Sequence, residues 1–168
     1  KAFHRFFFFF TPPPEGLPRR PPPEVRVAVT GSMLCAGDRG VPGALQKTGA
    51  GYLPLGCSGL AGLPATVPEN GAVESLAMAS FLDTVCMRNR PNRESFQWIL
   101  RRLEESGSRG LVLKTLSFCD LWNTEKERFR RDMPVPVLFL PGDGSSGEEE
   151  RTGIRIQAFV EMLEGAGD

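Results

Sequence analysis

The feature that most restricts the fold of this chain is a regular alternation of short apolar runs with helical patterns from Glu24 onward. Four runs are rich in aliphatic and β-branched residues and end at glycine, proline or serine, which is typical of buried strands. They cover residues 25–30, 51–55, 111–116 and 135–140. Strands that alternate with helices favour a parallel sheet covered on both faces. The sequence therefore predicts an α/β, Rossmann-like parallel sheet of about four strands with helices on both faces.

Helical spacing of apolar residues predicts the segments between these strands. The clearest pattern lies in residues 92–107, where Asn92 is an expected N-cap and Gly107 an expected C-terminal stop. Its apolar residues follow at i, i+3, i+4 and i+7: Phe96, Ile99, Leu100 and Leu103. We also expect helices over residues 41–48 and 73–85, one after Asp120 that carries Trp122, Glu125 and Phe129, and a last one with Ile156, Phe159, Val160 and Leu163 on one stripe.

The first 23 residues differ from the rest of the chain. They hold six of the twelve phenylalanines and seven of the fifteen prolines, without the periodicity of a helix or strand. We therefore expect residues 1–23 to be an irregular segment or interdomain linker, and residues 24–168 to form the α/β domain. The Phe run also resembles the apolar part of a signal peptide, which leaves secretion as an alternative, but no initiator Met or small-residue cleavage site accompanies it.

Charge and composition exclude several functional classes. The 168 residues carry 20 Lys and Arg against 20 Asp and Glu, so the basic footprint of a nucleic-acid or anionic-membrane binder is missing. No stretch reaches the roughly 20 apolar residues that span a bilayer. Four cysteines are too few for a disulfide scaffold in a chain of this length. The single histidine, His4, lies in the irregular segment, which argues against histidine acid–base chemistry in the domain.

Three of the four cysteines follow predicted strands. Cys35 comes after the first strand, Cys57 after the second and Cys119 after the third, whereas Cys86 lies near a helix end. The carboxyl ends of parallel strands meet at one edge of the sheet, where α/β proteins place their chemistry. Thiolates there suit zinc or an iron–sulfur cluster, although no CxxC pair fixes the ligand geometry. Spacing alone leaves open both metal binding and ordinary buried cysteines.

A longer pattern resembles a known family. The stretch RPNRESFQWILRRLEESGSRGLVLKTLSFCD resembles the helix, strand and cysteine loop in the C-terminal domain of the 2-hydroxyacyl-CoA dehydratase and benzoyl-CoA reductase family. RVAVTGSML resembles the opening strand and turn of that domain, and LGCSGLAG resembles its DxCxGxR segment. VPVLFLPGDG and RIQAFVEMLE resemble its last strand, loop and helix. The resemblance covers residues 25–163, and KTLSFCD is its most specific part.

This resemblance implies a subunit of an enzyme that acts on CoA thioesters. Such subunits have two α/β domains, pair with a homologous second subunit and hold a 4Fe-4S cluster, commonly on three cysteines. An ATP-dependent iron–sulfur activator protein supplies a low-potential electron. The thioester becomes a ketyl-type radical, which eliminates hydroxide in the dehydratases or is reduced further in the aromatic-ring reductases. The resemblance implies a cytoplasmic, oxygen-sensitive protein of which this chain holds about half.

The same resemblance implies roles for individual cysteines. Cys119 matches the family's cluster ligand in the KxxxFCD loop. Cys57 matches a family cysteine of open role, and the arginine of that segment has no clear counterpart here. Cys35 has no family counterpart and is expected to be structural, and Cys86 is expected to be peripheral.

Further candidates surround the cysteine loop. Lys114 precedes it and is expected either to neutralise cluster or CoA charge or to be a strand-edge lysine that reaches solvent. Gly144 and Ser145 lie in a glycine-rich loop before the last helix, a position suited to phosphate, although acidic residues 148–150 follow and would repel it. Arg155 matches an arginine near the start of the family's last helix.

A second hypothesis comes from a different functional class. The other two family ligands lie in an N-terminal domain that the resemblance does not place in this chain. Without them, the chain would be a catalytically silent α/β module used for assembly. Two further cysteines in an upstream α/β domain would favour the enzyme.

Overall fold

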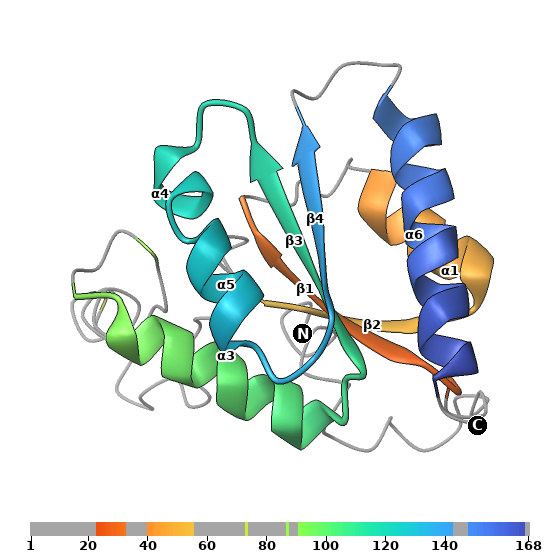
Figure 1. The fold of residues 1–168 in the computed structure, drawn as a ribbon, viewed down its shortest axis with the longest axis horizontal. Coiled ribbons are helices and arrows are strands. Elements are labelled where there is room, and N and C mark those ends of the chain that lie inside the picture. Colours follow the sequence, from red (N-terminus) through yellow and green to blue (C-terminus); the bar gives the residue numbers. More distant parts are fainter. Residues whose placement is uncertain are drawn as a thin grey trace.

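The computed structural model describes residues 23–32, 40–55, 73, 87, 91–142 and 148–166, and strands alternate with helices along these ranges (Figure 1). The strands are β1 (Arg26–Gly31), β2 (Gly51–Pro54), β3 (Gly110–Leu116) and β4 (Val137–Gly142). The helices are α1 (Gly40–Thr48), α3 (Arg93–Ser106), α4 (Asp120–Asn123), α5 (Lys126–Asp132) and α6 (Glu148–Gly165). Apart from single residues, the predicted irregular segment 1–23 and the predicted helix 73–85 lie outside the described ranges.

The four strands form one parallel sheet in the order β2-β1-β3-β4. This confirms the predicted α/β, Rossmann-like class. The order places β2 on one side of β1 and β3 on the other, so the chain changes winding direction between β1 and β3. In open α/β sheets, the loops that leave such a switch point diverge and leave room for a ligand beyond the carboxyl ends of the strands. The segment after β3 is therefore at the position where function is expected.

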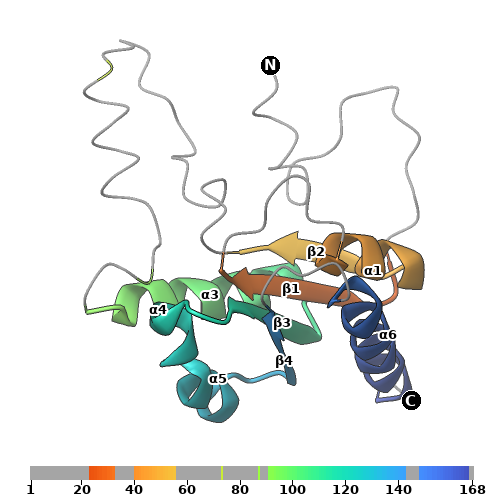
Figure 2. The same ribbon diagram turned by 90° about the horizontal axis from the view of Figure 1, so that it is seen from above.

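Figure 2 shows α1 and α6 on one side of the sheet and α3, α4 and α5 on the other, and a core cluster lies under each group of helices. On the face under α1 and α6, the aliphatic face, the buried residues are aliphatic except for Phe159: Val25, Val27, Val29, Val41, Ala44, Leu45, Val112, Leu140, Ile156, Phe159, Val160 and Leu163. The opposite face, under α3, α4 and α5, is the aromatic face. Its buried residues are Ala28, Leu53, Leu55, Met87, Phe96, Ile99, Leu103, Leu111, Leu113, Trp122 and Phe129.

A glycine lets β1 and β3 meet closely at their carboxyl ends. Gly31 pairs with Lys114 and has φ 120°, a conformation that side chains rarely adopt. A Cβ at this position would overlap the carbonyl oxygen of Lys114. The next residue, Ser32, donates its backbone N–H to that same oxygen at 2.8 Å. The glycine predicted to end the first strand therefore brings the two central strands together.

Helix α3 agrees with its predicted pattern in all but one detail. Phe96, Ile99 and Leu103 are buried, and Gly107 ends the helix with φ 61°, the left-handed conformation of a C-terminal cap. Asn92 occupies the N-cap position, but its side chain makes no capping hydrogen bond. Its amide instead donates to Glu125 at 2.6 Å. The residue type correctly predicted the helix start, but Asn92 Oδ1, the atom that would accept a capping hydrogen bond, accepts one from Arg128 at 3.1 Å.

Prolines shape both edge strands. β4 begins at Val137 rather than at the predicted Val135, because Pro136 has no N–H to donate to a ladder. Its carbonyl nevertheless accepts a hydrogen bond from Leu111 at 3.0 Å. Pro54 in β2 and Pro141 in β4 pair with Val29 and Thr115 of the neighbouring strands.

No helix in the described part of the chain is long and apolar enough to cross a membrane.

Candidate functional site

The candidate site is the loop from the end of β3 to the start of α4, at the carboxyl edge of the sheet. It runs from Leu116 to Cys119 and contains the one cysteine that falls in the described ranges. The other three cysteines, Cys35, Cys57 and Cys86, lie outside the described residues. The predicted gathering of three cysteines at this edge therefore stays a prediction.

Hydrogen bonds from neighbouring strands hold the start of this loop. Leu116 donates its N–H to Ser32 Oγ, just past the end of β1, at 3.0 Å. Ser117 donates its N–H to the carbonyl of Gly142, the last residue of β4, at 2.8 Å, and its hydroxyl donates to the same oxygen at 3.2 Å. The loop is therefore tied at once to the ends of the two strands that flank β3.

The tip of the loop is exposed and apolar. Phe118 is 96% exposed and Leu116 is 40% exposed, the largest apolar exposure on this edge among the described residues. Cys119 follows directly and is half-buried against the aromatic face. Cys119 is therefore partly accessible, unlike a cysteine in the fully buried core.

Helix α4 starts at Asp120, with Cys119 at its N-cap position. The Cys119 carbonyl accepts hydrogen bonds from the backbone N–H groups of Trp122 and Asn123, at 3.1 and 3.0 Å. Its Sγ makes no capping hydrogen bond to the helix. A helix of four residues aligns few peptide dipoles, so the helix-dipole stabilisation expected for a Cys119 thiolate is small.

A buried polar cluster fixes α4 from below. Glu125 is 8% exposed and accepts a hydrogen bond from Asn92 Nδ2 at 2.6 Å. Arg128 donates to Asn92 Oδ1 at 3.1 Å, lies 3.7 Å from Glu125 Oε2, and stacks 4.0 Å from the ring centroid of Phe96. Buried polar groups that are mutually hydrogen-bonded specify one arrangement. This cluster joins the start of α3 to the junction of α4 and α5.

Lys114 and Cys119 lie on opposite faces of the sheet. Side chains alternate along β3, so Lys114 shares the side of Val112 on the aliphatic face, whereas Cys119 packs on the aromatic face. Lys114 is half-buried near the carboxyl end of β3, a central strand, and its two expected roles stay predictions.

The proposed phosphate loop adjoins a carboxylate. Gly144 and Ser145 lie outside the described residues, but both flanking elements are visible. The Glu148 carboxyl group lies so close to Gly142 that a Cβ on the glycine would overlap it. Negative charge therefore sits between the end of β4 and the start of α6, as the acidic run predicted. This charge opposes a phosphate in that loop.

Comparisons with known proteins bear on this site. The sequence model of the family described as "2-hydroxyglutaryl-CoA dehydratase, D-component" matches residues 11–163. The chain belongs to this family. It is also 25% identical over 150 residues to the protein named "Putative dehydratase subunit YjiM" of Escherichia coli (strain K12), an alignment that covers 86% of this chain and 39% of the relative. The chain thus spans well under half the length of that relative.

The family match covers the segment that contains the Cys119 loop. The resemblance seen in the sequence to 2-hydroxyacyl-CoA dehydratases is confirmed by the match. The match includes β3, the cysteine loop and α4, together with every other strand and helix except the last residues of α6.

The described residues supply one cluster ligand at most. Among them, no group of three or more His, Cys, Asp or Glu side chains is placed to hold a metal ion. The soft thiol of Cys119 suits iron–sulfur chemistry, and its Sγ is not engaged in capping α4. Cys119 therefore fits a cluster only as one ligand of a set completed elsewhere in the protein.

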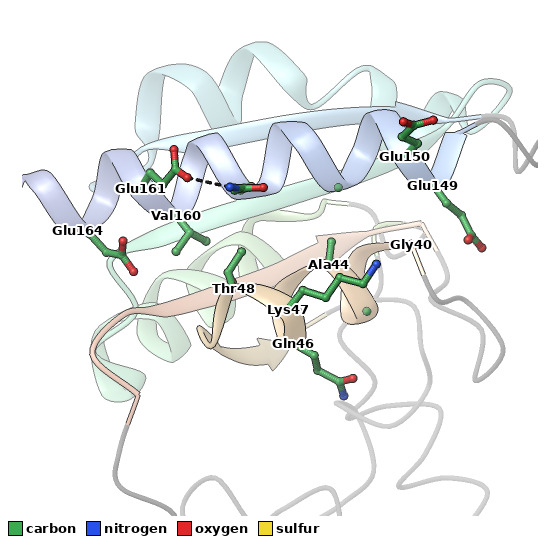
Figure 3. Close-up of a pocket in the computed structure, with 13 residues that line it drawn as sticks. Gly40, Ala44, Gln46, Lys47, Thr48, Glu149, Glu150, Val160, Glu161 and Glu164 are labelled. Carbon is green, nitrogen blue, oxygen red and sulfur yellow. Dashed lines mark hydrogen bonds between the residues drawn. The ribbon is translucent and has the colours of Figure 1, made fainter.

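An open groove of about 1240 Å³ between α1 and α6 is acidic (Figure 3). Its charged lining residues are Lys47, Glu149, Glu150, Glu161 and Glu164. Glu161 accepts a hydrogen bond from Gln157 at 3.0 Å. An excess of carboxylates repels phosphate, so this groove does not suit the phosphates of CoA.

Several residues around the site gave no sequence signal. Asn123 and Glu125 belong to no sequence motif, although the side chains of both make hydrogen bonds with residues outside their own helices. Asn92 was predicted only as a helix cap. Thr30 and Thr115 have buried hydroxyls without a hydrogen-bond partner among the described residues. Both lie on the aromatic face by strand alternation. The apolar patterns of β1 and β3 predict that positions 30 and 115 are buried, but not that their hydroxyl groups lack hydrogen-bond partners among the described residues.

Proposed function

We propose that this protein is part of a 2-hydroxyacyl-CoA dehydratase subunit in which Cys119 is one thiolate ligand of a 4Fe-4S cluster. Family membership supports the enzyme class. The observation that carries the ligand role is the half-buried cysteine, presented by a hydrogen-bonded loop at the carboxyl edge of the sheet. The remaining ligands come from outside the described residues, with Cys57 as one candidate.

The substrate in this proposal is a 2-hydroxyacyl-CoA thioester. When bound, the cluster supplies low-potential electron transfer from an ATP-dependent iron–sulfur activator, and the thioester eliminates hydroxide as a ketyl-type radical. Phe118 and Leu116 are exposed at the loop tip. When a second domain or subunit covers them, these two apolar side chains exclude water beside the thiol. Reduction of an aromatic acyl-CoA is the alternative reaction for the same loop.

Anaerobic reconstitution of the full-length protein with iron and sulfide tests the ligand role. We expect the unaltered protein to bind iron and to show the broad visible absorption of a cluster. Cys119→Ala is expected to lose most of both, because one anchoring thiolate is gone. Cys86→Ala is the matched control and is expected to retain both. Unchanged iron content and absorption in Cys119→Ala would reject Cys119 as a ligand.

The alternative is a catalytically silent assembly module. It rests on the expectation that the other two family ligands lie in an N-terminal domain outside this chain. This alternative predicts that the full-length protein, with all its cysteines, takes up no iron in the same reconstitution while still associating with a partner subunit. Stoichiometric, cysteine-dependent iron uptake would exclude it.

A further inference from the structure

We propose that Asn123 is a positioning residue for Cys119, holding the cysteine loop in the shape that presents the thiol. This inference rests on the proposed ligand role of Cys119. Asn123 lies four residues after the cysteine, at the end of α4. Its side chain and its backbone both turn back onto the loop.

Three hydrogen bonds connect Asn123 to the loop. Its side-chain Nδ2 donates to the carbonyl of Leu116 at 3.2 Å and to the carbonyl of Ser117 at 3.4 Å. Its backbone N–H donates to the carbonyl of Cys119 at 3.0 Å. Asn123 therefore donates to the carbonyls of two loop residues before the cysteine and to the carbonyl of the cysteine itself.

The chemistry of the amide suits this position. The carbonyls at the end of β3 need donors, and the asparagine NH₂ group offers two N–H bonds from one atom. Aspartate has nearly the same shape but only acceptor oxygens when ionised, so it would face the same carbonyls with repulsion. The Leu116 carbonyl also accepts the N–H of Cys119 at 3.0 Å, which closes the turn that contains the cysteine.

The loop depends on such hydrogen bonds because it buries little apolar surface. Leu116, Ser117 and Phe118 are all exposed. Segments with few buried contacts open locally at small free-energy cost unless hydrogen bonds hold them. The Gly142 carbonyl restrains Ser117 from the β4 side, and Asn123 is the contact from the α4 side.

Asn123 itself lies on a fixed frame. Its neighbour Trp122 is 2% exposed, and the Trp122 and Phe129 ring centroids are 6.1 Å apart. Glu125, two residues on, is held by Asn92. Asn123 is half-buried at the surface of this frame. Its substitution should therefore loosen the loop while leaving the core intact, which separates a positioning role from a structural one.

The test uses the full-length protein without iron and compares Asn123→Asp, Asn123→Ala and the matched control Thr124→Ala. Thr124 is the next residue, and its hydroxyl donates to the Leu121 carbonyl at 3.3 Å, away from the loop. Hydrogen–deuterium exchange at residues 117–119 and alkylation of Cys119 by iodoacetamide, located by peptide mass spectrometry, are the readouts.

For both Asn123 variants we expect exchange at residues 117–119 to rise about fivefold to tenfold, the factor that one neutral hydrogen bond is worth. The alkylation rate of Cys119 should change in the same variants, with an unchanged thermal midpoint. Thr124→Ala should leave both rates as they are. Exchange that stays unchanged in Asn123→Asp, or that rises equally in Thr124→Ala, would overturn the positioning role.

These readouts do not require a cluster, so the two proposals fail separately. If Cys119→Ala retains iron while Asn123→Asp loosens the loop, the ligand role fails and the loop restraint stands. If Cys119→Ala loses iron and Asn123→Asp leaves exchange unchanged, the ligand role stands and the positioning role fails.

Discussion

The two faces of the sheet differ in what they bury. The aliphatic face packs α1 and α6 with aliphatic side chains and one phenylalanine. The aromatic face stacks Phe96, Trp122 and Phe129, with Phe96 and Phe129 5.1 Å apart in an edge-to-face pair. It also borders the buried polar cluster of Asn92 and Glu125. The aliphatic face only packs helices against the sheet. The aromatic face also holds α4, the helix that directly follows the cysteine loop.

The largest effect should come from removing the ring at the centre of the aromatic face. Phe129 is fully buried, and Phe129→Ala is expected to lower the free energy of unfolding by about 4 kcal/mol, from lost burial and the cavity left behind. Leu45→Ala on the aliphatic face should cost about 3 kcal/mol. Chemical denaturation measures both.

The same pair of variants separates scaffold from site. Phe129→Ala should also change the alkylation rate of Cys119, since Trp122 loses its packing partner, whereas Leu45→Ala should not. Equal effects on Cys119 would show that the two faces do not differ in their relation to the site.

A second prediction concerns the polar cluster. Glu125→Leu leaves the Asn92 amide and the Arg128 guanidinium without their buried acceptor, and we expect a loss of about 2 kcal/mol. Glu125→Gln keeps an acceptor oxygen for Asn92 and should cost about 1 kcal/mol. Urea denaturation of both variants gives the comparison. A larger loss for Gln than for Leu would contradict the hydrogen-bonding account.

The third prediction concerns substitutions that should stabilise the fold rather than destabilise it. Thr30 and Thr115 bury hydroxyls that no described residue satisfies, so Thr30→Val and Thr115→Val should each stabilise the fold by about 1 kcal/mol. The reciprocal change on the aliphatic face, Val29→Thr, introduces an unsatisfied hydroxyl and should destabilise by about 2 kcal/mol. Thermal denaturation distinguishes these signs. Destabilisation by both valine variants would mean that the hydroxyls have partners.

The smallest effect lies at the surface of α5. A hydrogen bond from Arg131 holds the pKa of the Asp132 carboxyl below its ordinary value, with a smaller contribution from the charge of Arg128. A carboxyl group whose pKa is lowered in the folded state stabilises the fold at pH values above its unfolded pKa of about 3.9. This stabilisation is lost as the pH falls through the folded pKa. The difference in stability between the unaltered protein and Asp132→Asn should therefore be small at pH 7 and vanish in acid. A difference that grows in acid would contradict this sign.

Local pattern predicted the strands and helices well, because burial in a parallel sheet leaves continuous aliphatic runs such as residues 111–113. It failed where distant groups compete. Asn92 has the residue type of a cap, but Arg128, 36 residues away, donates to the side-chain oxygen that would accept a capping hydrogen bond. The missing N–H of Pro136 could have corrected the predicted start of β4 from Val135 to Val137.

The candidate site was less accessible to sequence reasoning than the fold. Cys119 was found because its loop resembles a family motif, and the structure places it at the predicted edge. Lys114 precedes the cysteine loop in sequence, but side-chain alternation along β3 places it on the aliphatic face, whereas Cys119 packs against the aromatic face. Asn123 was missed because its partners are backbone carbonyls, which leave no mark in a sequence.

The prolines of the edge strands have a consequence for self-association. In β2, Gly51 and Leu55 donate toward β1, so Pro54 turns its missing N–H outward. In β4, Pro136 and Gly142 accept from β3 and its following loop, so Pro141 faces outward too. The outward Phe139 carbonyl is already taken by Arg155 Nη2 at 2.7 Å. Each border of this sheet thus lacks a donor that a stray strand would require, which guards exposed β-structure against templated aggregation.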